Sequence, residues 1–163
     1  MIDFIRATER NEFELIEKLA DTIWREHYIP IVGEPQIDYM LKKLQSTPAM
    51  ITQYFEGVHY YIIRYNNEPV GYLAIKQEEN LLFLSKIYIL ENYRGNQIGA
   101  KSLEFVEEKA EIYRMQGIRL TVNVNNAKSI SFYEKLGFTN NGPLITYIGD
   151  GFIMDDYEMI KII

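Results

Sequence analysis

The sequence predicts an α/β (α+β) fold built on a mixed, mostly antiparallel central sheet of about seven strands. Three observations lead to this prediction. Residues 58–90 hold three successive segments with strand periodicity, residues 84–124 continue as strand, helix and strand, and residues 143–162 form a closing hairpin. Because the 163 residues contain no repeat, low-complexity tract or linker, we expect a single domain over residues 1–163.

The composition excludes several classes of protein. Hydrophobic residues make up 47% and aromatic residues 13% of the chain, which is too much for a disordered protein. Cysteine is absent, so disulfides, thiolate metal sites and thiol nucleophiles are ruled out together. We expect no metal in this protein.

Charge and hydropathy bear on location and partners. No cationic leader precedes an apolar run, and no apolar stretch approaches the roughly 18 residues of a membrane span. We therefore expect a soluble, cytoplasmic protein without a membrane partner. The 17 basic and 23 acidic residues give a net charge of −6, which disfavours nonspecific nucleic-acid binding and mildly favours a cationic partner.

The first third of the chain predicts one strand and three helices. Residues 2–6 alternate apolar and polar side chains as in a strand, and Thr8 is a plausible N-cap for the next helix. That helix is amphipathic, and we expect the segment around Pro30 to break it. Two further helices are expected to open at their N-terminal prolines, Pro35 and Pro48.

From residue 58 onward the apolar period changes to that of strands. Three such segments follow one another, separated by short polar turns, at residues 59–64, 70–75 and 81–90. We expect them to be consecutive antiparallel strands. The third segment is almost continuously apolar, which predicts burial on both of its faces.

The second half predicts a unit of strand, helix and strand, followed by another helix. A small-residue loop at residues 93–100 leads into a helix that extends to about Met115, with Gly117 as its C-terminal cap. Residues 118–124 form a short strand, which we expect to run parallel to the preceding strand through a right-handed connection. Asn125 and Asn126 are placed to cap the helix after it.

The junction between the strand at residues 84–90 and the following helix is an anion site on general grounds. The first turn of a helix carries unpaired backbone N–H groups and the positive end of the helix dipole. Both favour a phosphate or another anion. The sequence contains neither Gly-x-x-x-x-Gly-Lys-(Ser/Thr) nor Gly-x-Gly-x-x-Gly, so the common nucleotide-binding loops do not account for it.

Two motifs resemble those of the GNAT N-acetyltransferase superfamily. Its (Arg/Gln)-x-x-Gly-x-(Gly/Ala) loop is matched by Tyr93-Arg94-Gly95-Asn96-Gln97-Ile98-Gly99-Ala100. Its second signature is matched by Asn126, Ser129 and Tyr133-Glu134-Lys135-Leu136-Gly137-Phe138. One helix and one strand separate the two motifs, as in the family. The resemblance covers about the last half of the chain, and it implies helices on both faces of the sheet and acetyl-CoA as cosubstrate.

The resemblance also implies roles for individual residues. The loop would hold the pyrophosphate of acetyl-CoA, while the pantetheine arm would run along the preceding strand, where one amide could face the thioester oxygen. Tyr133 would donate a proton to the CoA sulfur as general acid, or would only pack against CoA. The implied cofactor-binding residues are Ile87, Tyr88, Ile89, Arg94, Gly95, Asn96, Gln97, Ile98, Gly99, Ala100, Asn126 and Tyr133.

One position departs from the family pattern. Gln97 stands where the loop usually has its first glycine. Gly99 is present at the second position, and we expect the turn into the helix to require no positive φ at Gln97. Binding of acetyl-CoA should therefore survive the departure.

The general base stays open. Many relatives place a carboxylate on the central strand about where Ser85 lies, and serine does not act as a base unaided. Four other side chains could act as the base instead, directly or through water: Glu56, Glu79, His27 and His59. The two glutamates also fit solvated surface charges, and the two histidines also fit structural residues.

The acceptor is a primary amine that the sequence does not identify. The last half is similar to bacterial polyamine (spermidine-type) acetyltransferases, and the acidic residues Asp155, Asp156 and Glu158 would suit a polycation. Those carboxylates fit equally well as protection of an edge strand against aggregation. Two functions remain: an N-acetyltransferase of small amines, as monomer or homodimer, or an acyl-CoA-binding sensor module without turnover.

Overall fold

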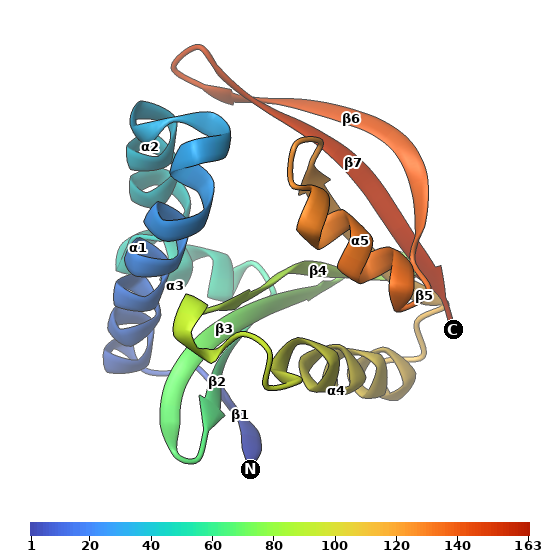
Figure 1. Ribbon diagram of the computed structural model, residues 1–163. Helices are drawn as coiled ribbons and strands as arrows, with labels where there is room; N and C mark the ends of the chain where they lie inside the picture. Colours follow the sequence, from blue (N-terminus) through green and yellow to red (C-terminus); the bar gives the residue numbers. More distant parts are fainter.

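The computed structural model describes residues 1–163 and contains one seven-stranded sheet with the order β1-β2-β3-β4-β5-β7-β6 (Figure 1). Neighbouring strands are antiparallel except β4 and β5, which are parallel. The predicted mixed, mostly antiparallel sheet of seven strands is confirmed. The strands are β1 (Ile2–Arg6), β2 (Val58–Tyr65), β3 (Glu68–Gln77), β4 (Leu81–Ile89), β5 (Gly117–Asn123), β6 (Thr139–Gly149) and β7 (Phe152–Ile162).

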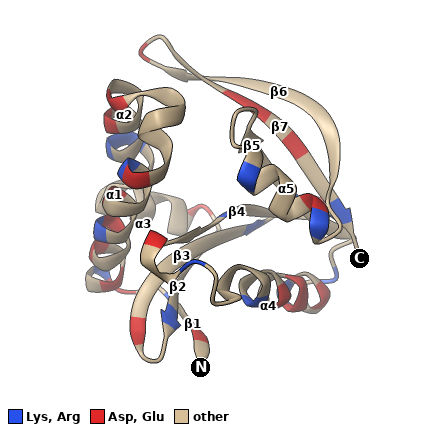
Figure 2. Ribbon diagram, viewed as in Figure 1, with Lys and Arg blue, Asp and Glu red and all other residues tan.

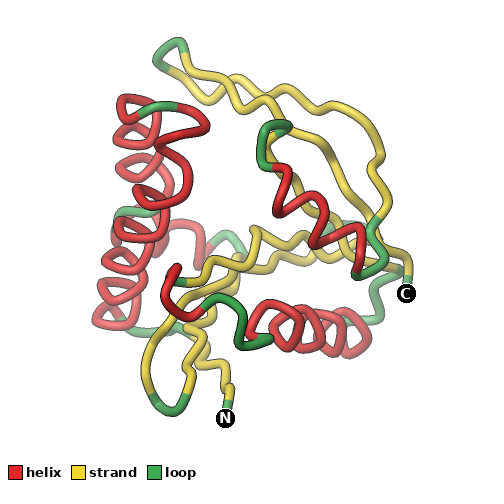
Figure 3. The backbone as a smooth tube through the Cα atoms, in the orientation of Figure 1, coloured by secondary structure: helices red, strands yellow, loops and turns green.

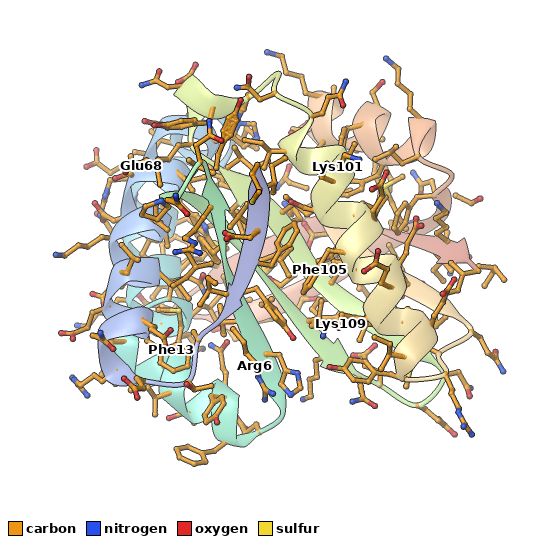
Figure 4. The ribbon with its side chains drawn as sticks, turned by 90° about the horizontal axis from the view of Figure 1, so that it is seen from below. Arg6, Phe13, Glu68, Lys101, Phe105 and Lys109 are labelled. Carbon is orange, nitrogen blue, oxygen red and sulfur yellow. The ribbon has the colours of Figure 1, made fainter.

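Helices cover both faces of the sheet. The residues of β2 alternate between two buried clusters: Tyr60 and Ile62 pack with the first three helices, Tyr61 and Ile63 with the last two. In Figure 4 the two sets of helices lie on opposite sides of the strands. Phe105 of α4 reaches β1, where its ring stacks on that of Phe4 with the ring centres 4.3 Å apart. The helices are α1 (Arg10–Val32), α2 (Glu34–Leu44), α3 (Thr47–Phe55), η1 (Glu91–Tyr93, a short 3₁₀ helix), α4 (Ile98–Ile112) and α5 (Ala127–Lys135).

The predicted N-cap of α1 is wrong, whereas the helix ends within the predicted segment around Pro30. Its N-cap is Glu9 rather than Thr8. The Glu12 carboxylate reaches back and accepts the backbone N–H of Glu9 at 3.0 Å and that of Thr8 at 2.9 Å. At the other end, Pro30 lies inside the helix, which continues to Val32. Val32, in the last turn, packs against the buried cluster of this face. None of the five α-helices combines the length and apolarity of a membrane crossing.

The predicted C-terminal cap of α4 at Gly117 is also wrong. The helix ends at Ile112, and the residue with positive φ after it is Arg114, at 58°. Gly117 is instead the first residue of β5, where a Cβ atom would come within 2.3 Å of the Lys161 carbonyl oxygen of β7. Close approach of two strands, rather than a helix end, therefore requires this glycine.

Strand β4 is the element that positions the site. It pairs with β5 only over Leu81–Phe83, and beyond that point the two strands no longer form a ladder. On its other side β4 pairs with β3, but the register passes from Leu73–Ile87 to Ala74–Ser85, so Lys86 is an unpaired bulge residue. The predicted burial on both faces is wrong, because only Leu82, Leu84 and Tyr88 of β4 are buried and the other residues of the strand are partly buried.

In the closing hairpin, β7 has the predicted bounds, whereas β6 begins at Thr139 and is longer than the segment predicted for it. Figure 3 shows this hairpin extending past the end of β5 toward the tip of α2. There the Tyr39 hydroxyl of α2 donates to the Ile148 carbonyl at 2.8 Å, and the Gln36 amide donates to the Ile153 carbonyl at 2.8 Å. The hairpin thus closes the space between α2 and the sheet.

A chain of buried hydrogen bonds ties α1 to the sheet. The Trp24 indole N–H donates to the Tyr72 hydroxyl at 2.9 Å, which donates in turn to the Gln45 side-chain oxygen at 2.6 Å. The Gln45 amide nitrogen donates to the Tyr60 hydroxyl at 3.0 Å. All four side chains are buried, so these hydrogen bonds satisfy polar groups that are removed from bulk water.

Tyr72→Phe is expected to lower the free energy of unfolding by about 1–3 kcal/mol, because it leaves the Trp24 N–H and the Gln45 oxygen without a partner. Urea unfolding should show a lower midpoint at an unchanged slope. Tyr65→Phe is the matched control, since the Tyr65 hydroxyl is partly exposed and makes no hydrogen bond within the chain. Equal midpoints for Tyr72→Phe and the unmodified protein would show that the chain of hydrogen bonds contributes nothing.

Candidate active site

Two cavities lie beside the open half of β4. The first, here called the loop cavity, has a volume of about 480 Å³ and lies between β4, the loop before α4, the start of α4, and α5. The second, here called the helix cavity, has a volume of about 360 Å³ and lies between α1, α2 and the strands β4, β5 and β7. Three residues line both cavities, so the two spaces meet at Tyr28, Lys86 and Tyr88.

The loop cavity brings together most of the predicted cofactor-binding residues. Its lining includes Ile87 to Ile89 of β4, the Arg94 and Gly95 loop positions, and Gln97 to Ala100 at the start of α4. Tyr133 of α5 joins them although it is about 40 residues away in the chain. All predicted residues except Asn96 and Asn126 lie on this one surface.

Asn96 and Asn126 are held away from the cavity surface by local hydrogen bonds. The Asn96 side chain donates to the Tyr93 carbonyl at 3.0 Å. Asn126 is 2% exposed and caps α5, because its side-chain oxygen accepts the Ser129 N–H at 3.4 Å. The same oxygen lies 3.3 Å from Nε2 of His27, and the Asn126 amide nitrogen has no partner. Asn126 therefore fixes α1 and α5 beside the cavity.

The Tyr133 hydroxyl contacts a backbone group on the open edge of β4. The Ile87 N–H donates to the Tyr133 hydroxyl at 3.3 Å, on the side where β5 has separated from β4. Burial raises the pKa of Tyr133 well above its ordinary value, so the phenol keeps its proton throughout the neutral range. A polar group entering between β4 and α5 would meet a backbone donor and a protonated hydroxyl together.

The turn into α4 differs from the sequence expectation. Gln97 has φ 60° and ψ 16°, the left-handed conformation, so the prediction that no positive φ is needed there is wrong. The chain must reverse its twist between the extended Arg94 and the helical Ile98 to aim the first N–H groups of α4 at the cavity. A glycine, the usual residue of this motif, adopts that conformation without strain.

Gln97→Gly is expected to stabilise the fold by about 0.5–1 kcal/mol, because removal of a strained left-handed side chain outweighs the added freedom of the unfolded chain. Thermal unfolding measures the effect. Lys101→Gly is the control, because Lys101 lies in ordinary helical conformation and its replacement should destabilise by about 1 kcal/mol. A destabilised Gln97→Gly protein would contradict the assigned conformation.

Gly99 marks the closest approach between α4 and α5. A Cβ atom at this position would lie 2.9 Å from Cζ of Phe132, which lines the same cavity. A larger residue at this position therefore requires the Phe132 ring to shift. The backbone of α4 is left bare toward the cavity, which suits the close approach of a phosphate.

Ser85 and the four candidate bases do not gather at one point. Ser85 lines the helix cavity and His27 the loop cavity, where burial, with the charge of Arg94, lowers the pKa of the His27 imidazole. The other three candidates line neither cavity: Glu56, His59 and Glu79. Residues at the far ends of α3, β2 and β3 do not reach this part of the sheet.

A carboxylate that the base candidates did not include lies in the helix cavity. Asp156 of β7 is 6% exposed, and burial raises its pKa, opposed by the charge of Lys86. The signal was present in the sequence, since Asp155 and Asp156 are adjacent and strand alternation must turn one of them inward. Glu158, the third member of the acidic cluster, is instead bound by Arg119 at 3.2 Å.

Known proteins share both the sequence pattern and this arrangement. The family model described as the acetyltransferase (GNAT) family matches residues 16–138. The chain belongs to this acetyltransferase (GNAT) family. The predicted family membership and its acyl-CoA-dependent N-acetyltransferase activity are thereby confirmed, and the GNAT loop is the stretch that lines the loop cavity.

Relatives and solved structures agree with this GNAT assignment. A spermine/spermidine N(1)-acetyltransferase of Bacillus subtilis is 29% identical over 125 residues, which cover 69% of this chain and 79% of that protein. A PaiA N-acetyltransferase from Thermoplasma acidophilum, solved with coenzyme A, superposes with a TM-score of 0.82 at 21% identity, covering 100% and 99% of the two chains. A GNAT family acetyltransferase from Elizabethkingia anophelis, solved with acetyl-CoA, superposes with a TM-score of 0.66 at 17% identity, covering 99% of this chain and 98% of that chain.

Proposed function

We propose that this GNAT protein transfers the acetyl group of acetyl-CoA directly to a small primary amine at the junction of its two cavities. The observation that carries the proposal is the open edge of β4. There a free strand edge, the start of α4 and the Tyr133 hydroxyl face one cavity, and a second cavity opens on the other side of Lys86. Direct transfer requires two binding spaces that meet at one point.

The loop cavity suits the CoA part of the donor. The N–H groups at the start of α4 and the Arg94 guanidinium favour the pyrophosphate, and the bare backbone at Gly99 permits its close approach. The open edge of β4 offers hydrogen bonds to the pantetheine amides in the manner of an added strand. The solved relatives from Thermoplasma acidophilum and Elizabethkingia anophelis, which hold CoA and acetyl-CoA, support this part of the proposal.

Tyr133 is proposed as the general acid. Its phenol is protonated at neutral pH, and its hydroxyl contacts the Ile87 N–H on the open edge where the thioester would lie. Proton donation to the departing sulfur would make the leaving group a neutral thiol. The Ile87 N–H could then face the thioester oxygen, which develops negative charge during attack.

The acceptor is proposed to bind in the helix cavity. Polyamines form one class to be tested, because the relative from Bacillus subtilis is named for spermine and spermidine. Only one of the three predicted acidic residues, Asp156, lines this cavity.

A thiol-release assay tests the function. Purified protein with acetyl-CoA and a panel of polyamines, alkylamines, amino acids and peptides should release CoA thiol with at least one class of amine. Isothermal calorimetry measures acetyl-CoA affinity on the same samples. Tight binding of acetyl-CoA without thiol release from any amine would favour a sensor module and contradict the proposed transfer.

A further inference from the structure

The helix cavity is mainly apolar. Its walls are formed by aliphatic, thioether and aromatic side chains from α1, α2, β4 and β7, among them Val32, Ile37, Met40, Leu44, Phe83 and Met154. The hairpin of β6 and β7 closes it toward α2 through the hydrogen bonds of Gln36 and Tyr39. A ligand that fills this space must present a largely apolar body.

One carboxylate opens into this apolar space. Asp156 lines the cavity and has an exposed fraction of 6%. Its side chain makes no hydrogen bond with any other residue of the chain. Met154 lines the same cavity because residues two apart in β7 share a face, whereas Asp155 is exposed on the other face. Figure 2 shows the acidic segments along β7. A buried carboxylate without a partner favours a cationic hydrogen-bond donor.

The other charged side chain that lines the helix cavity is the ammonium group of Lys86. Lys86 lies at the boundary of the two cavities, donates to the Tyr28 hydroxyl at 2.9 Å and has its Nζ 4.7 Å from the centre of the Tyr28 ring. The cavity therefore contains one negative and one positive side chain. A second ammonium on the ligand would find no second carboxylate in the lining, and it would be repelled by Lys86.

We infer that the acceptor is a primary amine with one cationic group and an apolar body, whose nitrogen is held and deprotonated by Asp156. The inference rests on the proposed function and names the substrate class of that same site. Lys86 acts as a specificity-determining residue that excludes polycations. Asp156 supplies the base that is missing at Ser85.

The proton and bond changes balance without a further reagent. The bound ammonium gives one proton to the Asp156 carboxylate, and the neutral nitrogen attacks the thioester carbonyl carbon. The N–C bond forms as the C–S bond breaks, the sulfur takes the proton of Tyr133, and the nitrogen returns its second proton to Tyr133. Amide and thiol leave, and Asp156 loses its proton to solvent.

The groups around Asp156 determine the pH dependence. The titratable groups that line the cavity with Asp156 are Tyr28 of α1 and Lys86 and Tyr88 of β4, and Asp155 adjoins Asp156 in β7. The lining residues of β5 and α2, such as Asn123 and Gln36, are uncharged. Burial raises the pKa of Asp156 above that of an exposed aspartate. Turnover should therefore fall, as pH decreases, at a higher pH than an exposed aspartate would give.

A matched pair of substrates tests the class of amine. n-Hexylamine and 1,6-diaminohexane have the same length and differ only by a second ammonium. We expect kcat/KM for n-hexylamine to exceed that for the diamine by about tenfold or more. In Lys86→Met protein the ratio should fall toward one, because the repulsive charge is gone. A wild-type preference for the diamine or for spermidine would overturn the inference.

A matched pair of variants tests the base. Asp156→Asn should lower kcat/KM for n-hexylamine by at least about 100-fold and abolish the acidic limb of its pH profile, with acetyl-CoA affinity unchanged. Asp155→Asn makes the same charge change on the exposed face and should leave kcat/KM within about twofold. An Asp156→Asn protein that keeps both the rate and the acidic limb would remove Asp156 from this role.

The outcomes separate this inference from the proposed function. Acetylation of the diamine or of polyamines in preference to n-hexylamine overturns the inference and leaves the N-acetyltransferase function standing. Absence of thiol release with every amine overturns both. Acetylation of n-hexylamine that depends on Asp156 and not on Asp155 supports both.

Discussion

Gly99→Glu is expected to weaken acetyl-CoA binding by at least about 100-fold, measured by calorimetry. A Cβ atom alone at this position would lie 2.9 Å from the ring of Phe132, so a larger side chain must extend into the loop cavity. Its carboxylate would then occupy the space that the start of α4 offers to the pyrophosphate. Steric exclusion and repulsion between like charges act in the same direction.

Lys101→Glu is the control for Gly99→Glu. Lys101 lies in the same helix but is exposed and outside the cavity lining, so its replacement should change the affinity by less than about threefold. Circular dichroism and thermal unfolding should show that both variants remain folded. Normal affinity in a folded Gly99→Glu protein would show that the start of α4 does not bind the donor.

Tyr133→Phe is expected to reduce kcat by roughly 100-fold to 10,000-fold while acetyl-CoA affinity changes little, because the ring is kept and only the acidic proton is lost. The ring packs against Phe132 and Phe138, which the replacement does not disturb. The decrease should shrink for an acyl donor whose leaving thiol is more acidic, since such a thiol departs without protonation. This dependence on the leaving group separates proton donation from packing.

Tyr113→Phe is the matched control for Tyr133→Phe. Tyr113 lies after the last turn of α4 and lines neither cavity, so its hydroxyl should be dispensable for turnover. Unchanged turnover in Tyr133→Phe would remove Tyr133 from the acid role and leave it as a packing residue. Equal losses for every acyl donor would lead to the same conclusion.

The strand and helix order followed from local patterns in the sequence. Strand alternation in residues 59–64 and 70–75, and the parallel connection before residue 118, were confirmed because hydrophobic period and chain handedness act over short distances. The errors lay at element ends, where contacts distant in sequence decide. Pro30 lies inside the last turn of α1, and Gly117 permits close strand approach rather than ending a helix.

The sequence by itself determined the family and the identity of the loop, because the loop motif and the Tyr133 motif are contiguous runs with fixed spacing. Only the tertiary structure decided where the helix cavity lies and which acidic side chain lines it. Asp156, Lys86 and Tyr28 come from β7, β4 and α1, and no local pattern predicts their meeting. The physical reason is that β5 separates from β4 after Phe83, and this opening, with the bulge at Lys86, creates the two cavities.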